Sequence, residues 1–72
     1  LKQVAVIKEI DSLVGLGILR PPLREIAELR LQYPEASLTE LGKLLSPPLS
    51  KSGVNHRFRE IYRIANQLRK EQ

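Results

Sequence analysis

The sequence predicts a small all-α domain, a bundle of about four helices, and three observations support this fold class. Apolar residues recur at steps of three and four, the spacing that keeps side chains on one face of a helix. Ser37 and Glu40 have the spacing of a capping box, which marks a helix start. Glycines and prolines interrupt the helical pattern at 15, 17, 21–22, 34 and 47–48. The 72 residues are expected to form one single domain, near the lower size limit for a core without disulfides or metal.

The first helix is expected over residues 2–14. Val6, Ile10 and Leu13 share one face, and Ala5 and Val14 widen it. Two glycines after this segment end the helix. Two further apolar residues lie at the start of this helix, Val4 and Ile7. We favour core packing for them over contact with another domain or subunit, since small domains bury wide apolar stripes.

The second helix is expected to begin at Pro21 and Pro22 and to run to about Leu31. A proline in the first helical turn costs no hydrogen bond, because the amide it lacks has no partner there. Pro34 closes this helix, since proline removes a donor and clashes with the preceding turn.

The third helix follows the capping box, in which the Ser37 hydroxyl accepts from the Glu40 amide and the carboxylate accepts from the Ser37 amide. Pro47 and Pro48 should stop this helix near Ser46. Gly42 costs about 1 kcal/mol in a helix interior relative to alanine, so we expect it to permit a close helix crossing. The predicted buried residues are Leu38, Leu41, Leu44 and Leu45.

The fourth helix is predicted over about 50–69, capped by Ser50. A connection of about four residues makes it the neighbour of the third helix, at a nearly perpendicular angle, as in a helix-turn-helix. Gly53 has two interpretations, close approach of a phosphate or simple tolerance near a helix start. The apolar face comprises Val54, Phe58, Ile61, Ala65 and Leu68. The opposite face carries Ser52, Asn55, His56, Arg59 and Arg63.

Charge is distributed unevenly along the chain. Residues 43–72 hold seven Lys and Arg against two Asp and Glu, a net of +5, whereas residues 1–42 have a net of −1. A basic excess concentrated on one helix is typical of a surface that meets phosphates. The chain has no cysteine and one histidine, and its carboxylates are scattered, so we expect no metal, no cofactor and no enzymatic activity.

The basic helix predicts a DNA interface. Asn55 has an amide that can pair with adenine in two hydrogen bonds, and Arg59 can do the same with guanine. We expect base contacts from Ser52, Asn55, His56 and Arg59. The free amides at a helix start favour an anion, and we expect phosphate contacts from Ser50, Lys51, Arg57 and Arg63.

The segment LSPPLSKSGVNHRFREI, residues 45–61, resembles the C-terminal helix-turn-helix domain of the WhiA family, transcription regulators of sporulation and cell division in Gram-positive bacteria. The upstream segment LRPPLREIAELRLQYPEASLTELGKLL resembles it as well. The resemblance implies a fold similar to the promoter-reading region 4 of sigma factors and binding to short promoter sites. The positions that match the family's motif are Ser50, Lys51, Ser52, Asn55, His56 and Arg57.

Partners and a location are also expected. The chain begins at Leu1 and has no methionine, so we expect a piece of a longer protein whose N-terminal domain looks like a degenerate LAGLIDADG homing endonuclease without cleavage activity. Duplex DNA is the expected partner, with that N-terminal domain and RNA polymerase or a sigma or other transcription factor as further candidates. We expect no membrane partner and a cytoplasmic, nucleoid-associated location.

One alternative from a different class is a helical protein-interaction module that docks on the transcription machinery. It would show an exposed apolar patch at Val4, Ile7 and the edge of Tyr62 in place of a basic face. Binding to single-stranded RNA is a third possibility, but the chain has few aromatic residues on which bases could stack.

Overall fold

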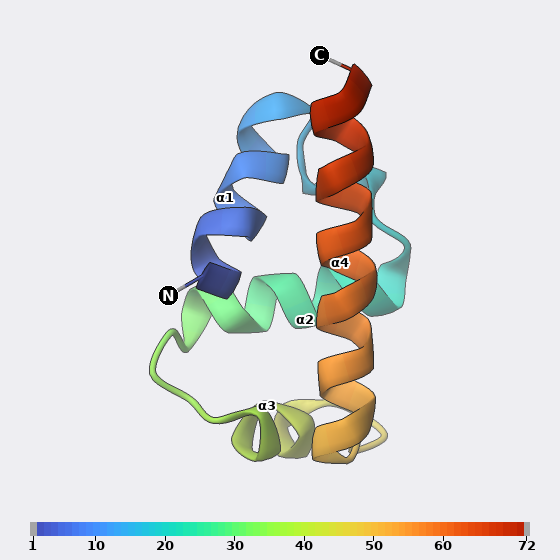
Figure 1. Ribbon diagram of the computed structural model, residues 1–72. Helices are drawn as coiled ribbons and strands as arrows, with labels where there is room; N and C mark the ends of the chain where they lie inside the picture. Colours follow the sequence, from blue (N-terminus) through green and yellow to red (C-terminus); the bar gives the residue numbers. More distant parts are fainter. Residues whose placement is uncertain (1, 72) are drawn as a thin grey trace.

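The computed structural model describes residues 2–71, which form an all-α bundle. Figure 1 shows α4 running the length of the molecule, with α1 beside its C-terminal half, α2 crossing at its middle and α3 lying across its foot. The predicted fold class is therefore confirmed. The elements in chain order are α1 (Lys2–Leu13), the 3-10 turn η1 (Leu16–Ile18), α2 (Pro21–Gln32), α3 (Leu38–Leu44) and α4 (Lys51–Glu71).

Helix α1 buries Val6, Ile7 and Ile10, so core packing is the correct interpretation for Ile7. The prediction that Leu13 is buried was wrong: Leu13 is 39% exposed and Val14 46% exposed. The reason is that α1 ends at Leu13 and Gly15 turns the chain with φ of 83°. At this end of the core the buried side chain is instead that of residue 19, beyond the 3-10 turn. The sequence did not predict that turn.

Helix α2 begins at Pro21 and Pro22 as predicted and ends at Gln32, where the Tyr33 amide still donates to Leu29 O at 2.8 Å. Arg30 lies on its buried face and is only 3% exposed. Sequence reasoning did not anticipate a buried arginine in this core.

Arg30 connects three parts of the fold. Its Nη1 donates to Pro34 O at 2.9 Å and to Ala36 O at 2.8 Å, in the loop between α2 and α3. The guanidinium carbon lies 5.7 Å from the centroid of the Phe58 ring of α4, a cation–π arrangement. Burial lowers the pKa of Arg30 because desolvation disfavours the charged form. The loop that leads into α3 is therefore held against both α2 and α4.

Helix α3 has the predicted capping box. The Glu40 amide donates to Ser37 Oγ at 3.0 Å, and the Ser37 amide donates to Glu40 Oε1 at 2.7 Å. The backbone hydrogen bond from Ser37 lowers the pKa of Glu40 because it stabilises the carboxylate. Helix α3 thus begins at the predicted residue.

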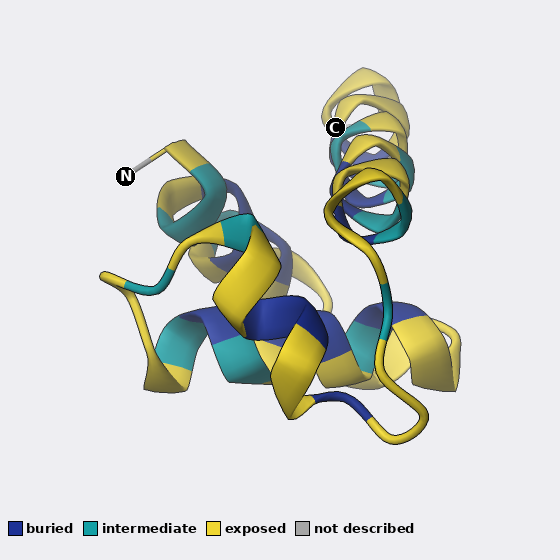
Figure 2. Cartoon of the chain, turned by 90° about the horizontal axis from the view of Figure 1, so that it is seen from below, coloured by how far each residue is buried: buried dark blue, intermediate teal, exposed yellow. Residues whose placement is uncertain are grey.

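The end of α3 corrects two expectations. Leu44 is 50% exposed although it was predicted to be buried, because α3 ends there and Leu45 adopts an extended conformation that turns its own side chain into the core. The connection to α4 spans residues 45–50, longer than the expected four or so. Figures 1 and 2 show α3 lying crosswise to α4, as expected of the motif.

Both helical glycines adjoin Leu49 in that connection, a contact that the sequence did not indicate. A Cβ on Gly42 would lie 2.0 Å from the carbonyl oxygen of Leu49 and 3.3 Å from Val54 Cγ2, so the closest approach is to the turn, and α4 also packs closely there. A Cβ on Gly53 would lie 2.7 Å from Leu49 Cγ. The two glycines therefore make room for the backbone and the side chain of Leu49, which fixes α3 against the start of α4.

Helix α4 buries all five residues of its predicted apolar face. Ser50 caps the helix, since the Gly53 amide donates to Ser50 Oγ at 3.2 Å. Figure 2 shows buried residues gathering where the helices meet, while exposed residues cover the outside. The packing leaves the opposite side of α4 open to solvent.

Candidate nucleic-acid interface

The outward face of α4 presents four exposed polar or basic side chains from its N-terminal half. The predicted base-contacting residues Ser52, Asn55, His56 and Arg59 are all exposed. They lie between positions 52 and 59, a distance of about 10 Å along the helix axis, and within roughly 100° of one another around it. The structure thus brings these four side chains onto one face.

The N-terminus of α4 combines free backbone donors with exposed side chains. Ser50 already accepts from Gly53, so its hydroxyl stabilises the helix start. Lys51 and Ser52 are exposed at the first turn, where the helix dipole is positive. This end of α4 has the chemistry to hold a phosphate.

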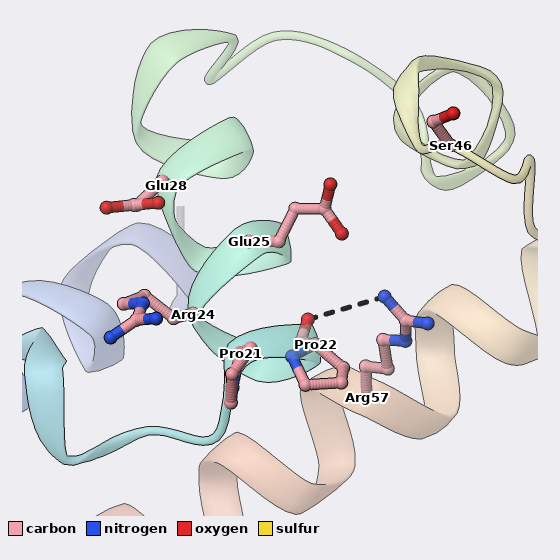
Figure 3. A pocket seen from close by; sticks show the side chains of 7 residues that line it. All are labelled: Pro21, Pro22, Arg24, Glu25, Glu28, Ser46 and Arg57. Carbon is pink, nitrogen blue, oxygen red and sulfur yellow. Dashed lines mark hydrogen bonds between the residues drawn. The ribbon is translucent and has the colours of Figure 1, made fainter.

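Arg57 contacts α2, which the sequence did not indicate. It is half-buried, and its Nη1 donates to Pro22 O at 3.3 Å. Figure 3 shows this bond at the edge of a hollow of about 510 Å³ between the start of α2, Ser46 of the turn and α4. Arg57 therefore holds α4 against α2 in the free domain, and its predicted phosphate contact stays a prediction.

Arg63 is exposed and paired with Glu60 at 2.5 Å. The hydrogen bond from Arg63 lowers the pKa of Glu60, and the positive charges of Arg63 and Arg20 lower it further. An exposed pair of this kind contributes little to stability. Arg63 is therefore available to exchange its carboxylate partner for a phosphate.

The C-terminal half of α4 is engaged with α1. Arg69 Nε donates to the Glu9 carboxylate at 3.0 and 3.1 Å, and this bond lowers the pKa of Glu9 and raises that of Arg69. The Lys2 ammonium lies 5.3 Å from the centroid of the Tyr62 ring. The predicted DNA contacts therefore lie mainly on the N-terminal half of α4, away from these interactions.

The apolar patch expected of a protein-interaction module is not where that alternative placed it. Ile7 is fully buried, and Val4 and Tyr62 are half-buried. Large exposed apolar side chains lie elsewhere, among them Leu13, Val14 and Ile18 around the end of α1. The surface around Val4 thus gives no support to the alternative.

Neither a metal site nor a membrane-spanning helix is found among residues 2–71. No group of three or more His, Cys, Asp or Glu in this range has the arrangement to hold a metal ion. None of its helices combines the length and the apolar character that crossing a bilayer requires.

Helix α4 is amphipathic, its outer face is basic, and it follows the shorter crosswise helix α3 after a connection of six residues. This arrangement defines a helix-turn-helix domain. The chain belongs to the family described as the WhiA C-terminal HTH domain, whose model matches residues 1–65. The resemblance in the motif at 45–61 is thereby confirmed.

Several curated relatives are similar over nearly all of the chain. A "Probable cell division protein WhiA" of Clostridium acetobutylicum is 57% identical over 70 residues, 97% of this chain and 22% of the relative. Proteins of the same name from Clostridium perfringens and Clostridium botulinum are 59% and 56% identical over 68 residues, 94% of this chain and 22% of each relative. The chain thus spans about a fifth of the length of these relatives. No solved structure matches.

Proposed function

We propose that this domain binds duplex DNA in a sequence-specific manner, with the N-terminal half of α4 in the major groove. The observation that carries the proposal is the outward face of α4, where Ser52, Asn55, His56 and Arg59 are exposed on a helix whose opposite face is buried. A major groove admits one helix and displays a different donor and acceptor pattern for each base pair.

In this arrangement Asn55 and Arg59 are the principal readers. They lie one helical turn apart, so both reach base edges from one docked helix. Asn55 pairs with adenine and Arg59 with guanine, in two hydrogen bonds each. Ser52 and His56 supply single contacts beside them.

Phosphate contacts position the helix in the groove without specifying sequence. Lys51, Ser50 and the free amides at the start of α4 hold one phosphate. Arg63 gives up Glu60 and binds a second phosphate. The Arg57 guanidinium has five N–H donors, and those that are not bonded to Pro22 O also bind a phosphate.

The biological role that we propose follows the names of the relatives, "Probable cell division protein WhiA". The domain would direct a transcription regulator of cell division or sporulation to promoters, acting at the nucleoid in the cytoplasm. RNA polymerase or a sigma factor, and the remainder of the longer parent chain, are the protein partners of such a regulator. Its action is binding and not catalysis.

The test is a binding titration with a fluorescent duplex and with a single strand of the same sequence, between about 50 and 200 mM salt. We expect the duplex to bind more tightly. The logarithm of the duplex association constant should fall linearly with the logarithm of salt concentration, with a slope of about −0.9 for each phosphate contacted. An affinity that does not change with salt, or equal binding to the single strand, would contradict the proposal.

A further inference from the structure

The corner where α2 begins carries an arginine on a fixed backbone. Arg20 is extended, with φ of −58° and ψ of 150°, and its carbonyl accepts from the amides of Leu23 and Arg24 at 2.9 Å each. Leu19, the residue before it, is 2% exposed, and two prolines follow it. The Arg20 side chain itself is exposed and makes no capping hydrogen bond. A cation thus projects into solvent from a corner that has little freedom to move.

This corner is attached to α4 at the level of the outward face. The hydrogen bond from Arg57 to Pro22 O joins the two elements two residues beyond Arg20 (Figure 3). The charge of Arg20 also acts on Glu60, the neighbour of Arg59 in the sequence, and helps to lower the Glu60 pKa. Arg20 therefore borders the recognition face on the side of α2.

Two other cations near this border are engaged in the described part of the chain. Arg57 donates to Pro22, and Arg63 is paired with Glu60. Arg20 has no ion pair or side-chain hydrogen bond among residues 2–71. A phosphate beside α2 would thus meet an arginine that has no protein partner to give up.

The corner that carries Arg20 and the Lys51 side chain lie on opposite sides of the reading face. At about 100° per residue, Lys51 is about 90° to one side of the mean direction of Ser52, Asn55, His56 and Arg59. Glu60, whose pKa the charge of Arg20 helps to lower, is about 90° to the other side, and Arg57, which donates to Pro22, is about 150° to that same side. A helix docked in the major groove meets a sugar-phosphate backbone on each side.

From this placement we propose that Arg20 binds a DNA phosphate on the strand that passes the α2 side of α4, opposite the strand bound by Lys51. The inference rests on the proposed function and adds to it a contact outside the helix-turn-helix itself. Its role is to position the domain on DNA of any sequence.

The experiment measures duplex binding of Arg20→Gln, Arg20→Lys and a control, Lys8→Gln, across the same salt series. Lys8→Gln removes the same charge from an exposed site on α1, beside Glu9, which binds the last turn of α4. The preferred site is the duplex that the unaltered domain selects from random sequences. We expect Arg20→Gln to weaken binding about three- to tenfold at low salt, equally for the preferred site and a scrambled duplex, and to reduce the salt slope by about 0.9. Arg20→Lys should restore most of this loss, and Lys8→Gln should leave the slope unchanged.

The outcomes separate the two proposals. Equal slopes for Arg20→Gln and Lys8→Gln, with tight binding by the unaltered domain, would overturn the Arg20 contact and leave the proposed function intact. Failure of the unaltered domain to bind duplex DNA would overturn both. Thermal melting of each variant verifies that the fold is kept. If Arg20→Gln melts early, its slope and that of Lys8→Gln are compared at a temperature at which both are folded: a lower slope for Arg20→Gln supports the contact, and equal slopes overturn it.

Discussion

Phe58→Ala is expected to destabilise the domain by roughly 3 to 5 kcal/mol, the range for removing a buried aromatic ring. Phe58 is 1% exposed, and the Arg30 guanidinium lies over its ring. The change leaves a cavity and also removes the surface on which a buried charge is stacked. Since small domains have a total stability of about 5 to 15 kcal/mol, much of the protein should be unfolded at moderate temperature.

Urea unfolding followed by circular dichroism measures this loss. The control is Arg63→Ala in the same helix, whose side chain is 71% exposed and paired only with Glu60. We expect the control to change the free energy of unfolding by less than about 0.5 kcal/mol, as is usual for surface sites. A loss below about 1 kcal/mol for Phe58→Ala would show that the ring is not a central part of the core.

Gly42→Ala should destabilise the protein by about 1 to 3 kcal/mol or more, although alanine is the better helix former by about 1 kcal/mol. The added Cβ would lie 2.0 Å from the carbonyl oxygen of Leu49, and the Leu49 amide donates to Gly42 O at 3.0 Å. The substituted side chain can be accommodated only by moving the turn. That movement would displace Ser50 and the first turn of α4.

The matched control is Gly17→Ala, since a Cβ on Gly17 would meet nothing within 4 Å. Thermal melting compares the two variants. A Gly42→Ala protein as stable as the parent, or more stable, would mean that helix propensity outweighs the contact with Leu49 and that the turn adapts at little cost.

The sequence predicts those elements whose signals are local. The capping box at Ser37 and the prolines at the start of α2 depend on residues within one turn, and both appear in the structure. The buried face of α4 was also predicted in full, because its five apolar residues at helical spacing all lie on one side of the helix.

The errors occur where tertiary packing determines which residues are buried. Leu13 and Leu44 continue the apolar pattern of their helices, but each is the last residue of a helix that ends at the edge of the core. Arg30 continues the buried positions of α2 at helical spacing, which was a usable signal. Its burial nevertheless depends on the carbonyls of the following loop, and no local pattern shows that these would turn toward it.

The outward face of α4 could be predicted from the sequence, whereas the contacts between α4 and the start of α2 could not. Helical spacing alone places Asn55 and Arg59 together, whereas the contact from Arg57 to Pro22 joins residues 35 positions apart. The position of Arg20 beside α4 likewise follows from the packing of α2. Sequence reasoning therefore predicted the exposed outward face of α4 and missed the surface beside it.

The most direct test of the account compares Asn55→Ala and Arg59→Ala with Lys51→Ala on the preferred duplex and a scrambled one, at several salt concentrations. Loss of a reader should cost about 1 to 3 kcal/mol on the preferred site, relax the choice of base at one position, and leave the scrambled duplex almost unaffected. Lys51→Ala should weaken both duplexes equally and reduce the salt slope by about one phosphate's worth. If Asn55→Ala and Arg59→Ala instead weaken both duplexes equally, this face of α4 does not read the bases and the central claim is wrong.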